Sequence, residues 1–180
     1  MNYISTRGTA PILNFEQVLL AGLASDGGLY VPQSWPTLST QEIRALAGQP
    51  YGAVAQTVMQ PFIGDFMEPH DFRALIDQAY GGFNHPAIAP LMQSGANEWL
   101  LELHHGPTLA FKDVAMQLIG QMLEAILTRR AERVTIVGAT SGDTGSAAIE
   151  AFRGLDAADV FILYPEGRVS EVQRRQMTTP

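Results

Sequence analysis

Residues 134–152, VTIVGATSGDTGSAAIEAF, set the fold class of this chain. Val134 to Val137 form a short apolar strand of the kind that parallel sheets bury on both faces. A glycine-rich loop comes next, and a helical segment then continues to Phe152. Strand, loop and helix in this order predict one unit of an α/β layered domain. The loop is expected at the edge of the sheet where open α/β folds bind ligands.

The same alternation extends to both sides of this unit. Residues 99–103 read as a strand, and a long helix with an apolar stripe from Ala115 to Ile126 comes after a Gly-Pro turn. Residues 160–164 read as a further strand, and Ser170 with Gln173 forms a capping box that opens another helix. Three strands are few for a sheet covered on both faces, so we expect the chain to be a truncated piece of a longer protein.

The first half of the chain is predicted to be mainly helical. A short extended segment opens it, and Asn14 with Gln17 caps a first helix. Amphipathic spacing predicts three more helices, which begin at Ser39 or Thr40, at Tyr51 and at Glu68, and Ile43 and Leu46 are expected to face inward in the first of these three. We therefore predict a helical N-terminal domain over residues 1–90 and a partial α/β domain over residues 91–180.

Composition and charge exclude several classes of function. The chain has 180 residues, of which 46% are hydrophobic and 16% charged, and this suits a folded core. A net charge of −7 argues against nucleic acid or an anionic membrane as a partner. There is no cysteine, so disulfides and thiolate chemistry are excluded, and no metal site is predicted. Without a signal peptide or a long apolar run, the sequence predicts a soluble, cytoplasmic protein.

Lys112 is the only lysine in the chain, whereas the other ten basic side chains are arginine. It stands between Phe111 and Asp113, just after the Gly-Pro turn. A lysine amine, unlike a guanidinium, can lose its proton and attack a carbonyl to form a Schiff base. The alternative from spacing alone is an ordinary residue in the first turn of a helix.

The loop from Gly138 to Ala147 has the chemistry of an anion cradle. Its glycines allow close backbone approach, the helix that follows offers unpaired N–H groups, and hydroxyl side chains add donors. It is neither a Walker loop nor a GxGxxG fingerprint, because the required lysine and first glycine are missing. The alternative is a turn of small residues that merely lets a helix pack closely.

Two motifs together resemble one family. HGPTLAFKD at residues 105–113 and ATSGDTG at residues 139–145 are similar to the corresponding motifs of threonine synthases, which are fold type II enzymes that use pyridoxal 5'-phosphate (PLP). YISTRG at residues 3–8 and DGGLYVP at residues 26–32 resemble the N-terminal region of that family. The resemblance covers nearly the whole chain and implies the start of a three-layer, parallel-sheet core.

This resemblance implies a reaction, a cofactor and a set of site residues. The reaction is conversion of O-phospho-L-homoserine and water to L-threonine and phosphate, by a monomer or homodimer. Lys112 would hold PLP as a Schiff base and then act as the general base. The implied cofactor-binding residues are Lys112, Phe111, Asp113 and Asp143, and the implied substrate-binding residues are Thr140, Ser141, Gly142, Thr144, Arg7 and His105.

Several alternatives stay open on the sequence alone. Arg7 could pair with a surface carboxylate, and His105 could be satisfied by the adjacent loop backbone. The enzyme could be a PLP-dependent phospho-lyase or dehydratase that yields a 2-oxo acid. The family's second glycine-rich loop, which binds the PLP phosphate, is not visible before Pro180, so the chain could also be a non-catalytic module.

Overall fold

The computed structural model describes residues 1–180, which form two compact units, Met1–Ile76 and Asp77–Pro180. The division falls inside helix α4 (Pro69–Tyr80), earlier in the chain than the domain boundary expected at residue 90. The first unit also contains β1 (Asn2–Ser5), β2 (Leu13–Asn14), α1 (Phe15–Ala21), β3 (Tyr30–Pro32), α2 (Thr40–Ala45), α3 (Tyr51–Ile63) and the short 3₁₀ helix η1 (Gly64–Phe66). The second contains β4 (Leu91–Gly95), β5 (Glu98–Leu101), α5 (Asp113–Arg130), β6 (Val134–Ala139), α6 (Asp143–Ala151), β7 (Ala158–Leu163) and α7 (Glu171–Thr178).

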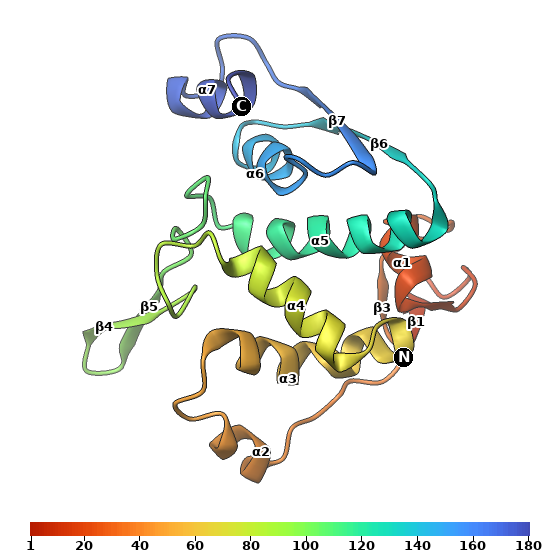
Figure 1. The fold of residues 1–180 in the computed structure, drawn as a ribbon, viewed down its shortest axis with the longest axis vertical. Helices are drawn as coiled ribbons and strands as arrows, with labels where there is room; N and C mark the ends of the chain where they lie inside the picture. Colours follow the sequence, from red (N-terminus) through yellow and green to blue (C-terminus); the bar gives the residue numbers. More distant parts are fainter. The chain divides into compact units, whose positions relative to one another are not determined.

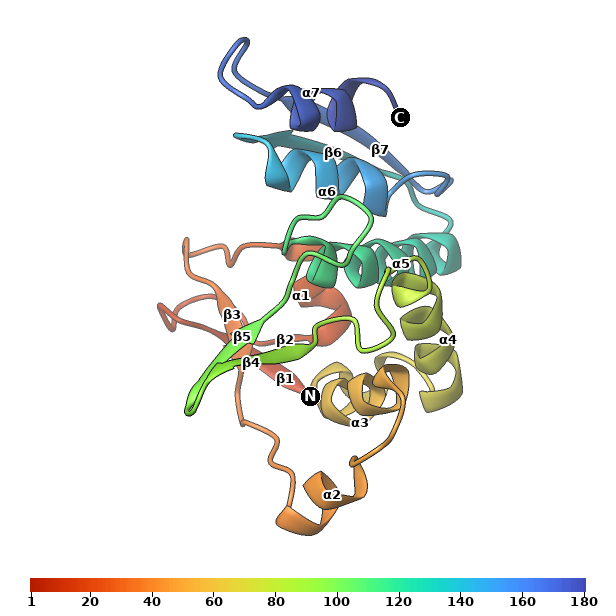
Figure 2. The same ribbon diagram turned by 90° about the vertical axis from the view of Figure 1, so that its left-hand side faces the viewer.

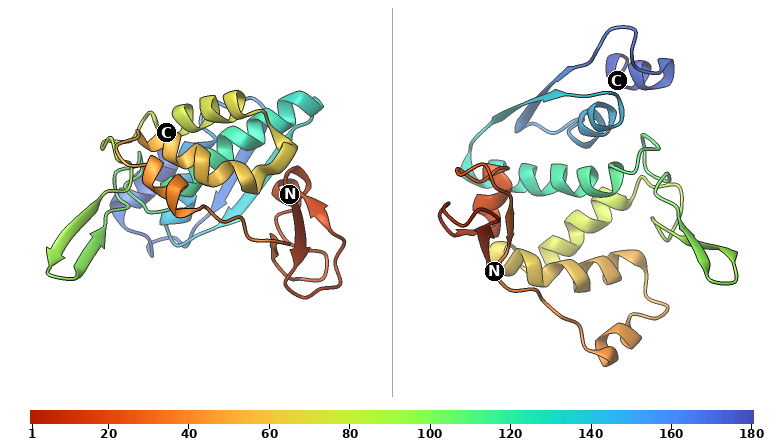
Figure 3. Two further views of the ribbon diagram at one scale, coloured as in Figure 1. Left: turned by 90° about the horizontal axis from the view of Figure 1, so that it is seen from below. Right: turned by 180° about the vertical axis from the view of Figure 1, so that it is seen from behind.

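The first unit combines helices with a small antiparallel sheet of strand order β2-β1-β3, drawn in red and orange in Figure 3. The predicted cap of α1 is confirmed, because Asn14 and Gln17 form a capping box. Tyr3 on β1 is buried and donates its hydroxyl to the Phe62 carbonyl of α3 at 2.8 Å. Phe72 and Ile76 on α4 are fully buried, as their helical spacing predicts.

One expectation for this unit is wrong. Helix α2 begins at Thr40 with the predicted Ser39 cap, but Ile43 is 57% exposed instead of facing inward. A helix of six residues has too few turns to carry an apolar stripe onto a core, so the spacing of Ile43 and Leu46 had little predictive value.

The second unit is built on helix α5, against which α6 packs (Figure 1). Strands β6 and β7 are parallel and pair in register from Val134–Ala158 to Ala139–Leu163, which confirms the predicted α/β crossover. Much of the core of this unit consists of apolar side chains on the two helices and the chain just after α6: Leu118, Met122, Ile126, Leu127, Ala147, Ala148, Ala151 and Phe152.

Two expectations about the sheet need correction. The predicted strand at 99–103 does not join the parallel sheet. Instead, β5 pairs with β4 as an antiparallel hairpin, shown in green in Figure 2. The parallel sheet is also not buried on both faces, because Val137, Phe161 and Leu163 are each more than half exposed. Apolar strands alone do not reveal how many layers cover them.

Close approach of α5 to α6 depends on a glycine. A Cβ at Gly120 would overlap the carbonyl oxygen of Ala151, which is a backbone atom and cannot rotate away. We expect Gly120→Ala to destabilise the chain, because overpacking costs about 1–3 kcal/mol against roughly 1 kcal/mol of helix propensity gained. Urea unfolding measures the loss. Gly82→Ala is the control, since no atom lies within 4 Å of its Cβ position; equal stability of the two variants would contradict the packing argument.

No helix is long and apolar enough to span a membrane.

Candidate active site

The loop that carries Lys112 is tied down by a buried carboxylate. Asp113, the first residue of α5, is fully buried and accepts hydrogen bonds from the Thr108 backbone N–H and hydroxyl, each at 2.8 Å. Burial raises the pKa of Asp113, against the lowering effect of these bonds. Gly106 packs so closely on this side chain that a Cβ would overlap it. The Asp113 side chain therefore holds the loop against the start of α5 through two hydrogen bonds and its packing on Gly106.

Lys112 stands at the N-cap of α5, at the edge of this loop. Its Nζ lies 4.1 Å from the centroid of the Phe111 ring, and it makes no ion pair with a carboxylate. An aromatic face attracts an ammonium through its π electrons, so this contact orients the Lys112 side chain over the ring. Phe111 itself is 55% exposed. The only primary-amine side chain thus lies, partly exposed, beside an aromatic ring.

The glycine-rich loop opens helix α6, and its own threonine holds it in shape. Thr140 Oγ1 accepts from the backbone N–H groups of Gly142 at 3.0 Å and Gly145 at 3.1 Å. Gly142 has a φ of 146°, which other residues rarely adopt, and its missing Cβ leaves space for Gln173. The hydroxyl of Thr140 is therefore used within the loop.

Two other hydroxyls of the same loop remain available. Ser141 and Thr144 are exposed and form no hydrogen bond within the chain. They lie on either side of Asp143 at the N-terminal end of α6, where the helix dipole favours an anion. The anion cradle at this loop stays a prediction.

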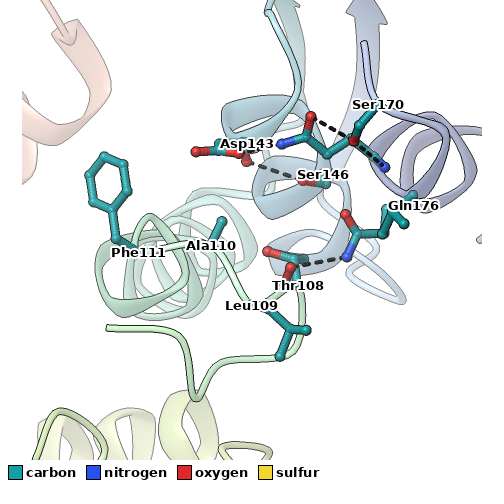
Figure 4. A pocket seen from close by; sticks show the side chains of 10 residues that line it. Thr108, Leu109, Ala110, Phe111, Asp143, Ser146, Ser170 and Gln176 are labelled. Atoms are coloured by element: carbon teal, nitrogen blue, oxygen red, sulfur yellow. Dashed lines mark hydrogen bonds between the residues drawn. The ribbon is translucent and has the colours of Figure 1, made fainter. Parts of the chain in front are cut away.

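A cavity of about 470 Å³ lies where these two loops meet α7 (Figure 4). The Lys112 loop contributes Thr108 through Phe111, and the glycine-rich loop with α6 contributes Asp143 and Ser146. The remaining wall comes from the segment around α7: Ser170, Val172, Gln173 and Gln176. Of the residues that the resemblance implicates, Phe111 and Asp143 line this cavity; Lys112 follows directly after Phe111.

Two glutamines of α7 hold the cavity walls together. Gln173 Nε2 donates to Asp143 Oδ1, and Gln176 Nε2 donates to the Thr108 carbonyl at 3.0 Å (Figure 4). Neither glutamine was predicted to lie at this site: Gln173 was expected only in a capping box, and Gln176 had no predicted role. Ser170 does cap α7 by accepting from the Gln173 N–H, but the Gln173 amide points to Asp143. No local pattern distinguishes these two uses of a glutamine.

His105 lies before the lysine loop and is engaged by a carboxylate, not by the loop backbone. Its Nε2 is 2.7 Å from Glu102 Oε2, and its ring lies beside those of His104 and His85. The hydrogen bond to His105, with the nearby imidazoles, lowers the pKa of Glu102. A role for His105 in substrate binding stays a prediction.

Arg7 belongs to the first unit, where it helps to close a turn. Its Nη1 donates to the Asp26 carbonyl at 3.0 Å, and the Asp26 carboxylate accepts from Ser5 and from the Thr9 and Ala10 N–H groups. These bonds, that from Ser5 above all, lower the pKa of Asp26. The partner of Arg7 is therefore a backbone oxygen, and its role in substrate binding stays a prediction.

A lysine loop and a glycine-rich helix start that meet at one cavity beside a parallel sheet define an α/β domain with a candidate ligand site. Residues 2–80 match the family model described as the threonine synthase N terminus. Threonine synthase of Pseudomonas aeruginosa is 60% identical over 99% of this chain. A PLP-bound threonine synthase from Brucella melitensis matches the structure with a TM-score of 0.95 at 60% identity, and the yeast enzyme with 0.93 at 40%; each match covers 99% of this chain. The chain is thus similar to threonine synthases over 99% of its length, and residues 2–80 carry the match to the N-terminal family model.

The match covers only part of each relative. The chain spans 38% of the length of the Pseudomonas aeruginosa protein and 38% of each of the two solved structures. What those proteins bind and catalyse is therefore carried to this chain only as a proposal.

Proposed function

We propose that this chain is the lysine-bearing part of a threonine synthase, a carbon–oxygen lyase that acts on O-phospho-L-homoserine and works in the cytoplasm. One observation carries the proposal: Phe111, the neighbour of the single lysine in sequence and the ring that its Nζ contacts, lines the same cavity as Asp143 of the glycine-rich loop. The similarity to threonine synthases over 99% of the chain supports the proposal, as does the contribution of both motifs to one cavity.

The residues present fit PLP. A cavity of about 470 Å³ is of the size that cofactors occupy, Phe111 offers an aromatic face, and Lys112 has no competing ion pair. A Cβ at Gly145 would meet Met177 Sδ at 2.7 Å, so this glycine allows α7 to pack closely on the start of α6. We assign Lys112, Phe111 and Asp143 to binding the cofactor. Asp113 is assigned to holding the lysine loop through its hydrogen bonds to Thr108.

PLP, when bound, supplies an electron sink for negative charge at the substrate α carbon. Lys112 Nζ would hold the cofactor, and its amine would move protons at the α and β carbons of the substrate. Ser141 and Thr144 donate their free hydroxyls to the substrate carboxylate at the positive end of α6. Gln173 holds the carboxylate of Asp143 in place at the cavity wall.

A chimera tests this proposal. The chain replaces its counterpart in the Pseudomonas aeruginosa threonine synthase, which supplies the remaining length of the enzyme. We expect the purified chimera to convert O-phospho-L-homoserine to equal amounts of threonine and phosphate. Phosphate with 2-oxobutyrate would instead identify a phospho-lyase, and a folded chimera that releases no phosphate would support a non-catalytic module. The unmodified enzyme serves as the reference.

A further inference from the structure

Three possible metal-binding side chains lie together where β5 leads into the lysine loop. Glu102, His104 and His105 each offer a ligand atom, and these atoms all lie within 4.8 Å of one another. Glu102 Oε2 and His105 Nε2 are 2.7 Å apart. Ligand atoms about 2.0–2.2 Å from a tetrahedral zinc ion are roughly 3.3 Å from one another. The Glu102–His105 separation is shorter than this value and no pair of ligand atoms is more than 4.8 Å apart, so side-chain rotations could bring the three atoms to the required spacing.

The backbone that carries this cluster is fixed at both ends. The Glu102 N–H donates to the Pro90 carbonyl at 3.0 Å, and the His105 carbonyl accepts from the Asn84 N–H at 2.8 Å. The ligand-bearing segment is thus held in one conformation before an ion arrives. Such preorganisation avoids part of the ordering cost of binding.

The three side chains also differ in a way that suits a metal site. Glu102 and His105 are mostly buried, with side chains 18% exposed, whereas His104 is exposed and open to solvent. The cluster therefore offers one carboxylate and two imidazoles as ligand groups. His85 lies beside His105, and its Nδ1 already accepts from the Ala87 N–H at 3.1 Å.

We propose that Glu102, His104 and His105 bind a divalent transition metal ion such as Zn²⁺. Two imidazoles and one carboxylate are the ligand set of open zinc sites, in which water takes the fourth position. The ion would clip the end of β5 to the start of the loop that ends at Lys112. This site is separate from the cavity, which none of the three residues lines.

Cobalt titration tests the proposal on the 180-residue chain. Co²⁺ is added in a metal-free, phosphate-free buffer, and visible d–d absorption reports a low-coordinate site that Zn²⁺ then displaces. We expect His104→Ala and Glu102→Gln each to weaken binding at least about tenfold, because even outer-shell changes cost 10–100-fold in metal affinity. Neither change removes a buried apolar group, and circular dichroism checks that both variants fold.

His70→Ala is the matched control. His70 lies on α4 with its side chain 96% exposed, 3.4 Å from the carboxylate of Asp71, and it is not part of the cluster. We expect this variant to bind Co²⁺ as the unmodified chain does. Binding that is equal in all four proteins, weakened equally by His70→Ala, or absent from the unmodified chain would overturn the proposal and leave Glu102–His105 as a structural hydrogen bond.

Discussion

Lys112→Arg is expected to abolish covalent PLP binding and, in the chimera, to reduce threonine formation by at least about 10²–10⁴-fold, the contribution of one positioned general acid–base group. Arginine keeps the positive charge over the Phe111 ring but cannot bond to an aldehyde or release a proton. Borohydride reduction of the PLP-treated chain, followed by peptide mapping, measures the first effect. The product assay measures the second.

A double variant separates site chemistry from simple lysine reactivity. Lys112→Arg combined with Arg168→Lys keeps one lysine per chain but moves it to an exposed turn between β7 and α7. We expect no stable adduct on this variant at PLP concentrations that saturate the unmodified chain. Equal labelling of the two proteins would mean that PLP merely reacts with any available amine, and the assignment of Lys112 would fail.

Asp113→Ala is expected to cause the largest loss of stability among the variants considered. The change leaves the Thr108 N–H and hydroxyl without their partner, and both are buried. A buried donor left unsatisfied costs about 1–3 kcal/mol, so we expect a loss of roughly 2–5 kcal/mol in the free energy of unfolding. Urea unfolding gives the value. A loss below that of Gly120→Ala would contradict the structural role of this carboxylate.

A double-mutant cycle with Thr108→Val tests whether the effect comes from this one contact. Valine keeps the shape of threonine but lacks the hydroxyl, so the two changes share a bond and should be non-additive. Additive losses would show that Asp113 stabilises the fold through other contacts, such as its packing on Gly106.

The pH dependence of stability gives an independent check on Asp113. Its pKa is raised in the folded chain, above all by burial, so the unfolded chain holds the charged form more easily. The stabilising contribution of this group is therefore greatest below its unfolded pKa and declines as pH rises through the folded pKa. An asparagine at position 113 does not titrate and therefore lacks this decline. We expect the free energy of unfolding of Asp113→Asn to increase relative to that of the unmodified chain as pH rises. A difference independent of pH would contradict the raised pKa.

Much of the site was predictable because its residues lie in short motifs. Lys112 is unique and the glycine-rich loop is continuous, so both stand out without any knowledge of the fold. The role of Asp113 was harder to predict. Its position at a helix start suggests a cofactor contact or a dipole interaction, whereas burial against Thr108 and Gly106 shows a carboxylate that holds the loop. Burial depends on the loop path, which residue spacing does not specify.

The sequence by itself determined the local elements of this protein: the capping box at Asn14, the long helix after Lys112, and the strand–loop–helix around Gly142. These follow from apolar periodicity and turn residues, which act over a few positions. Only the tertiary structure decided that β5 pairs with β4 and that Gln173 and Gln176 close the cavity. Strand pairing and side-chain contacts across many residues depend on which surfaces meet in space, and a polar side chain carries no local signal of its distant partner.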